Sequence, residues 1–140
     1  MTNNRLNLRS QLSELARLHS WIECLASEHS IPSRTQFAME LCLEEVLSNV
    51  IRHGYASAPD GSMTVQFTEP QSHQFLLIVE DQAPSFNPLG FPEPKSPSSS
   101  DEVPRGGWGI QLLREFADSI EYQRLPGGNR LLIGFLMARN

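Results

Sequence analysis

The stretch Phe37–Tyr55, FAMELCLEEVLSNVIRHGY, predicts one long helix that carries a narrow polar strip on an otherwise apolar surface. At about 100° per residue, Glu45, Asn49 and His53 fall on a single ridge opposite a broad apolar arc. A ridge of this kind is often no more than the solvated face of a surface helix. Ser48 and Asn49 are poor helix formers in mid-helix, however, which favours a functional strip over a solvated one.

Length and composition set limits on what the chain can be. With 140 residues it is long enough for one domain with its own core, so residues 1–140 are treated as a single domain. The formal net charge of −5 leaves no extended basic surface for direct binding of nucleic acid. No segment approaches the roughly 20 apolar residues that span a membrane. Cys24 and Cys42 lack metal-site or disulfide spacing, so we expect buried free thiols and a reducing, cytoplasmic location.

Hydrophobic periodicity divides the chain into strands and helices joined by turn-forming residues. Ser33 followed by Gln36 matches a capping box that would start the long helix, and Gly54 is expected to end it in the left-handed conformation. The expected elements are, in order, an edge strand over residues 4–10, helices over 11–29 and 33–54, strands over 62–69 and 73–81, a helix over 110–119, and strands over 120–125 and 130–137.

From about residue 82 to 106 the composition shifts to proline and serine, which excludes a regular helix or strand. A loop this long inside a small domain is usually a lid or a disordered linker. This one leads directly into RGGWGI at the start of a predicted helix, which favours the lid. Gly107 and Gly109 would let backbone N–H groups approach phosphate oxygens, and Arg105 could contact a terminal phosphate. The alternative for the glycines is a loop that needs unusual backbone angles.

Three residues are candidates for chemistry at a nucleotide. Asp81 follows a dense apolar strand, where it could accept a hydrogen bond from an exocyclic amino group such as that of adenine, or simply start a turn. The side-chain oxygen of Asn49 suits Mg²⁺ that is held mainly by phosphates and water. Glu45 lies one helical turn earlier and could accept a proton from an attacking hydroxyl or water. Its neighbour Glu44 points about 100° away, so Glu45 is the preferred base.

The chain contains, in order, the segments Glu45-x-x-x-Asn49 with Ile51–Tyr55, then Val79–Pro88, then Arg105–Ile110. In their order and spacing these three segments are similar to the N, G1 and G2 boxes of the anti-sigma factor serine/threonine kinases. That family belongs to the superfamily of gyrase, histidine-kinase and mismatch-repair ATPases, which share the Bergerat nucleotide-binding fold. The resemblance implies an α+β fold: a two-layer α/β sandwich in which a mixed, mostly antiparallel sheet is covered on one face by about three helices.

The resemblance implies an ATP-dependent protein kinase with an ATP·Mg²⁺ site on the long helix and the following strand. Glu45 corresponds to the family's catalytic base, Asn49 to its metal ligand and Asp81 to the residue that binds adenine. Ala83 stands where the superfamily has the glycine of its Asp-x-Gly, and a left-handed backbone there would be strained for alanine.

The G2 box gives the phosphate side of the implied site. The resemblance places Gly107 and Gly109 along the phosphates of ATP. It places Arg105 where an arginine of the lid meets the terminal phosphate.

The resemblance also implies protein partners. The family phosphorylates a serine on an anti-anti-sigma factor, a small protein of STAS type, and in another state sequesters a sigma factor. Arg17 matches a first-helix arginine that contacts these partners, although an exposed arginine is ordinarily a solvated charge. A homodimer is a further family expectation.

Two other functions are weighed against the kinase. One is an ATP-regulated binding module that captures a sigma factor or a STAS partner without phosphorylating it, which the retained Glu45 argues against. The other is the ATP domain of a histidine kinase. That function requires a phospho-acceptor histidine on an upstream pair of dimerisation helices, and His19 and His29 lack that setting.

Overall fold

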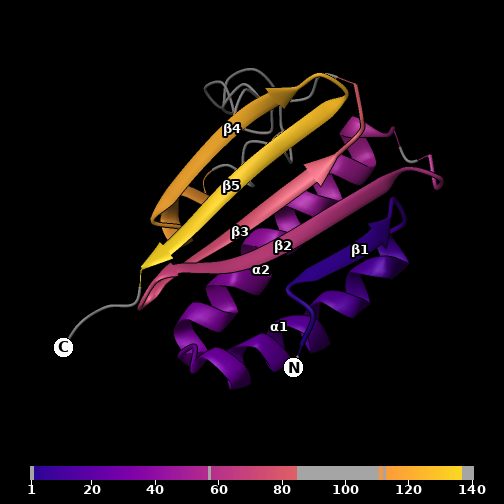
Figure 1. Ribbon diagram of the computed structural model, residues 1–140. Helices are drawn as coiled ribbons and strands as arrows, with labels where there is room; N and C mark the ends of the chain where they lie inside the picture. Colours follow the sequence, from indigo (N-terminus) through magenta and orange to yellow (C-terminus); the bar gives the residue numbers. More distant parts are fainter. Residues whose placement is uncertain (1, 57, 85–110, 112, 137–140) are drawn as a thin grey trace, which may run out of the picture.

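The computed structural model describes residues 2–56, 58–84, 111 and 113–136. Within these residues five strands form one sheet, and helices lie along one side of it (Figure 1). No described helix is long and apolar enough to cross a membrane. The strands are β1 (Arg5–Arg9), β2 (Ser62–Gln71), β3 (Gln74–Asp81), β4 (Ser119–Leu125) and β5 (Gly128–Leu136). The helical elements are the 3₁₀ segment η1 (Leu12–Leu15), α1 (Ala16–His29), α2 (Ser33–Asn49) and the π-helical segment η2 (Val50–Gly54), followed by a short helix at residues 111 and 113–116.

The sheet has the strand order β1-β2-β3-β5-β4. All four of these pairings are antiparallel, so the described sheet is antiparallel throughout rather than mixed. β1 lies at one edge, as the short alternating pattern predicted. β3 lies in the centre, which explains its dense run of apolar residues.

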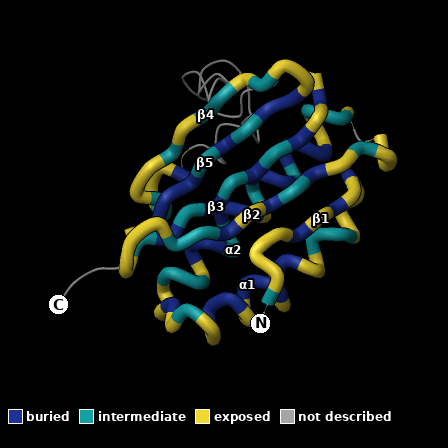
Figure 2. Tube along the Cα trace, viewed as in Figure 1, coloured by how far each residue is buried: buried dark blue, intermediate teal, exposed yellow. Residues whose placement is uncertain are grey.

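One face of the sheet carries the core. Along β3, Phe75, Leu77, Val79 and Asp81 are buried, while the residues between them are half-buried. This alternation follows from the two-residue period of a strand and puts the buried set on the face that α1 and α2 cover (Figures 1 and 2). The helices close the layer with fully buried side chains that include Leu18, Ile22, Leu25, Met39, Leu43 and Leu47.

Both predicted caps of the long helix are wrong. The N-cap of α2 is Pro32, whose extended backbone (φ −63°, ψ 152°) precedes the helix, and no side chain caps it. Ser33 is therefore already inside the helix. At the other end the chain does not turn left-handed at Gly54. The helix continues into η2, and the left-handed residue is Ala56, with φ 50°.

The two cysteines differ from each other. Cys42 is a residue of α2 and is buried, and burial raises the pKa of its thiol to about 12. Cys24 is exposed on α1, so the prediction of two buried thiols is wrong for this residue. Its helix is amphipathic, and Cys24 falls outside the stripe formed by Leu18, Ile22 and Leu25.

Candidate functional site

The polar ridge of α2 enters the core at Asn49. Asn49 is only 3% exposed, whereas Glu45 is half-buried and Glu44 is exposed. The amide of Asn49 makes no hydrogen bond with any described residue. Within the described part of the chain no fully buried side-chain nitrogen or oxygen lacks a hydrogen-bond partner, so the amide atoms of Asn49 keep contact with the surface of the domain. Its oxygen is available to a ligand.

Asp81 ends β3 on the same covered face and is 6% exposed. Its Oδ1 accepts hydrogen bonds from the backbone N–H of Ala83 (2.9 Å) and from Nδ2 of Asn129 (2.8 Å). Its Oδ2 accepts none from the described residues. Burial raises the pKa of Asp81, and the hydrogen bonds from Asn129 and Ala83, together with the charge of Arg124, oppose that rise. One carboxylate oxygen is thus fixed, and the other is left for a hydrogen-bond donor.

Asn129, which holds Asp81, was not predicted as a site residue. It is 3% exposed and lies directly opposite Asp81 in the pairing of β3 with β5. Its Oδ1 accepts hydrogen bonds from the hydroxyl of Tyr122 (2.6 Å) and from the guanidinium of Arg124 (3.0 Å). The strand predicted from the sequence begins at residue 130, whereas β5 begins at Gly128, so only the register of the hairpin reveals that Asn129 belongs to the strand.

The alanine at the G1 glycine position causes no backbone strain. Ala83 is buried, and its φ is not among the positive values found at the described residues. The left-handed backbone that would have been strained for alanine is therefore not used. Its N–H is instead turned back onto Asp81.

Tyr55 was also overlooked. Its hydroxyl donates a hydrogen bond to the carbonyl of Ser62 (2.6 Å) and accepts one from the N–H of Gln82 (2.7 Å). These bonds join the end of η2 to the ends of β2 and β3. Asn49 and Asp81 consequently face the same layer at the same end of the sheet.

Glu45 lines a groove of about 410 Å³ between η1 and α2. Leu12 and Leu15 form one wall, and Glu44 and Arg52 flank Glu45 on the other. The groove keeps the carboxylate of Glu45 accessible from outside the domain, one turn away from Asn49. An attacking group could reach it by this route.

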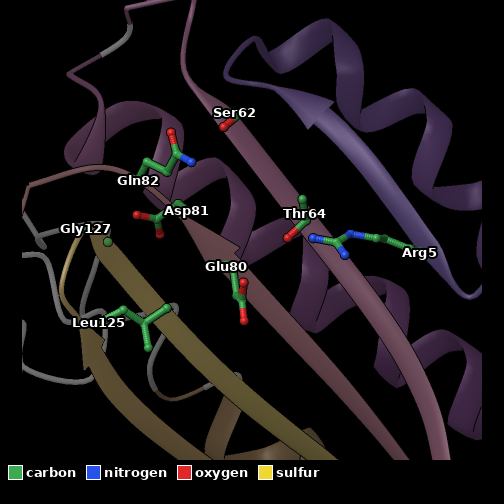
Figure 3. Close-up of a pocket in the computed structure, with 9 residues that line it drawn as sticks. Arg5, Ser62, Thr64, Glu80, Asp81, Gln82, Leu125 and Gly127 are labelled. Atoms are coloured by element: carbon green, nitrogen blue, oxygen red, sulfur yellow. The ribbon is translucent and has the colours of Figure 1, made fainter.

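A second cavity, of about 250 Å³, lies at the same end of the sheet (Figure 3). Arg5, Thr64 and Glu80 are among the residues that line it, and Glu80 forms an ion pair with Arg130 (2.7 Å). Successive strand residues face opposite sides, so Glu80 points away from the helices and Asp81 towards them. The cavity therefore belongs to the open face of the sheet.

The remaining predicted residues are placed apart from this site or are not described. Arg17 is exposed on α1, where it donates to the carbonyl of Asn7 (2.8 Å) and forms an ion pair with Glu14 (3.3 Å). Arg105, Gly107 and Gly109, which were assigned to the phosphates, lie outside the described residues.

The antiparallel sheet with helices on one face identifies the class of domain. The chain belongs to the family of histidine kinase-like ATPase domains, which it matches over residues 8–135. It is 28% identical over 114 residues to the serine/threonine-protein kinase BtrW of Bordetella bronchiseptica, covering 81% of this chain and 79% of that protein. It is 26% identical over 81 residues to the anti-sigma F factor of Heyndrickxia coagulans, covering 58% of this chain and 55% of that one. The resemblance to the anti-sigma factor kinases is thus confirmed.

Solved structures confirm the predicted fold. The RsbU and RsbW domains of a Mycobacterium tuberculosis protein match with a TM-score of 0.65 at 11% identity, over 99% of this chain and 34% of that one. The mycobacterial sensor histidine kinase MprB matches with a TM-score of 0.53 at 15% identity, over 94% of this chain and 97% of that one. At these identities the likeness concerns the fold alone. The chain spans about a third of the first of these proteins.

Proposed function

We propose that this chain is an ATP-dependent serine/threonine protein kinase that acts as an anti-sigma regulatory factor and phosphorylates an anti-anti-sigma partner of STAS type. The observation that carries the proposal is a pair of largely buried polar residues, Asn49 (3% exposed) and Asp81 (6% exposed). Each keeps a polar group that bonds no described residue: the amide of Asn49 and Oδ2 of Asp81. These polar groups are not sealed in the core, so in a histidine kinase-like ATPase domain they are suited to contact a bound nucleotide.

Each residue has a separate task in this proposal. Oδ2 of Asp81 accepts a hydrogen bond from the exocyclic amino group of adenine, which distinguishes ATP from GTP. Glu45 accepts the proton of the attacking serine hydroxyl, which enters from the groove. Arg105, Gly107 and Gly109 are assigned to the phosphates on sequence alone, and Arg17 to the protein partner.

The residues fit Mg²⁺ as the companion of ATP. Within the described part of the chain, no group of three or more His, Cys, Asp or Glu side chains could hold a metal ion. A cation at Asn49 would take its other ligands from phosphates and water, as Mg²⁺ commonly does. When bound, Mg²⁺ would neutralise charge on the phosphates during transfer.

The name of the relative BtrW, a serine/threonine-protein kinase, supports the kinase activity, and the name of the relative anti-sigma F factor supports the anti-sigma role. A cytoplasmic location follows from that role and is part of the proposal. A second candidate function is an ATP-regulated module that sequesters its partner without phosphorylating it. The anti-sigma F factor among the relatives is the observation that favours it.

ATP binding is tested first, by titrating the wild type, Asn49→Asp and Asp81→Asn with Mg²⁺-ATP in a calorimeter. We expect binding by the wild type and a loss of at least tenfold in both variants. Asn49→Asp adds a negative charge beside the phosphates, and Asp81→Asn presents an amide donor where the amino group of adenine needs an acceptor. A wild type that does not bind ATP would refute both candidate functions.

Phosphate transfer is then measured with the STAS partner and labelled ATP. Glu45→Ala is expected to lower transfer by about 10²–10⁴-fold and leave ATP binding nearly intact. Glu44→Ala is the matched control, because Glu44 is the exposed neighbour of the same type. Equal transfer by Glu45→Ala and the wild type would show that the base is misassigned. Partner capture that depends on ATP, with no phosphoserine formed by the wild type, would select the binding module.

A further inference from the structure

The backbone hydrogen-bond ladder between β2 and β3 ends at the start of β2 and the end of β3. Its last registered pair at this end is Met63 with Asp81, so a continued ladder would pair Ser62 with Gln82. In place of that pair, the hydroxyl of Tyr55 accepts a hydrogen bond from the N–H of Gln82 (2.7 Å) and donates one to the carbonyl of Ser62 (2.6 Å). Figure 3 shows Ser62 and Gln82 at the facing ends of the two strands. The hydroxyl of Tyr55 therefore bridges the N–H of Gln82 and the carbonyl of Ser62, in place of a direct backbone hydrogen bond between them.

Tyr55 is aimed at this gap by the π-helical end of the long helix. Its N–H bonds to the carbonyl of Val50, five residues back, at 2.8 Å. This wider turn rotates the following residue relative to an α-helix, and such turns are frequent at functional sites. The ring then packs on Gly61, where an added Cβ would come within 2.6 Å of it. The ring is thus clamped, and its hydroxyl is held at the strand ends.

We propose that Tyr55 is a positioning residue of the nucleotide site, and that its hydroxyl fixes where the backbone leaves β3 after Asp81. The proposal rests on the proposed binding of ATP by Asp81. A direct bond between Gln82 and Ser62, about 2.9 Å long, would draw the chain towards β2. The inserted hydroxyl holds the two backbones further apart, which turns the N–H of Ala83 onto Oδ1 of Asp81. The direction of the free Oδ2 thus depends on Tyr55.

The protonation state of Tyr55 suits this role. A phenol has a single proton, and donation to Ser62 uses it, so the residue must be neutral. Burial raises the pKa of Tyr55, and the charge of Asp81 raises it further, against the effect of the two hydrogen bonds. The hydroxyl therefore keeps its proton across the physiological range.

The test compares Tyr55→Phe with the wild type. Phenylalanine keeps the ring on Gly61 and removes only the hydroxyl. We expect the dissociation constant for ATP to rise by about tenfold and that for GTP to change by less than about twofold, so that discrimination between them falls. Trp21→Phe is the control, because it removes a hydrogen bond of Trp21 to the carbonyl of Asn3 (2.8 Å) in another part of the fold. It should leave discrimination unchanged.

Amide hydrogen exchange gives a second readout that does not need a ligand. In Tyr55→Phe the N–H of Gln82 should exchange faster by at least tenfold, while the ladder amides of β2 and β3 stay protected. Unchanged exchange at Gln82, or unchanged discrimination in a variant that is folded, would overturn the role of Tyr55. Absence of ATP binding by the wild type would overturn the proposed function instead, and the exchange experiment distinguishes the two outcomes.

Discussion

Replacing Asn129 with alanine is expected to destabilise the fold by about 3 kcal/mol, mostly through its effect on Asp81. A hydrogen bond to a charged group contributes about 1.5–3 kcal/mol, and the bond from Asn129 to the Asp81 carboxylate is 2.8 Å long and buried. The remainder comes from the small cavity and from the hydroxyl of Tyr122, which loses its acceptor. The exposed Asn7 of β1 provides the matched control, since Asn7→Ala should change stability by less than about 0.5 kcal/mol.

A double-mutant cycle isolates the contact with the carboxylate. In the background of Asp81→Asn the same bond joins two neutral groups and is worth about 1 kcal/mol. The coupling between Asn129→Ala and Asp81→Asn should therefore be about 1–2 kcal/mol. Stability is measured by urea unfolding, followed by the fluorescence of Trp21, which is 7% exposed in the folded state. A coupling below about 0.5 kcal/mol would refute the inference that Asn129 holds the carboxylate.

The same variant changes the titration of the carboxyl group. The hydrogen bond from Asn129 lowers the pKa of Asp81 against the larger effect of burial. Removing the bond should therefore raise the pKa of Asp81 further above its ordinary value. Carbon-13 NMR of the Asp81 carboxyl as a function of pH measures this directly, and a lower pKa in Asn129→Ala would contradict the hydrogen-bond assignment.

Three further predictions concern stability and reactivity. Burial raises the pKa of Asp81, so the stability that this group contributes is complete below its ordinary pKa of 3.8 and is lost as pH rises through the folded-state pKa. Asp81→Asn should accordingly melt higher than the wild type near neutral pH, with a gap that closes on acidification. In Gly128→Ala the new Cβ would lie 1.8 Å from the backbone oxygen of Asp81, so we expect a loss of more than about 2 kcal/mol in urea unfolding. A thiol reagent should modify exposed Cys24 readily and Cys42 only after denaturation, because burial raises the pKa of the latter to about 12; mass spectrometry with and without urea would show this.

Features that depend on one element could be predicted from the sequence. The ridge of Glu45 and Asn49 follows from helical periodicity, and Asp81 follows from the end of a dense apolar run. The resemblance of three segments to the N, G1 and G2 boxes predicted the fold, and the structure confirms that prediction. Each of these signals lies within a short window of the chain, where pattern and conformation are directly linked.

Features that depend on register or on competition between local signals could not be predicted. Asn129 acquires its role only because β5 pairs with β3 so that it faces Asp81. Tyr55 acquires its role from a π-helical turn that has no sequence signature. The expected caps at Ser33 and Gly54 are short motifs that the surrounding packing overrode.

The adjacency of β3 and β5 bears on how this domain can diversify. These two central strands are neighbours although the chain between Asp81 and Gly128 separates them in sequence. Their pairing brings the two ends of that stretch together, and the entropy cost of chain inserted between two fixed ends grows only with the logarithm of its length. Doubling such a loop costs about 0.6 kcal/mol. Homologous domains can therefore lengthen, shorten or rewrite the segment that follows the G1 box while the sheet and the buried polar pair stay the same.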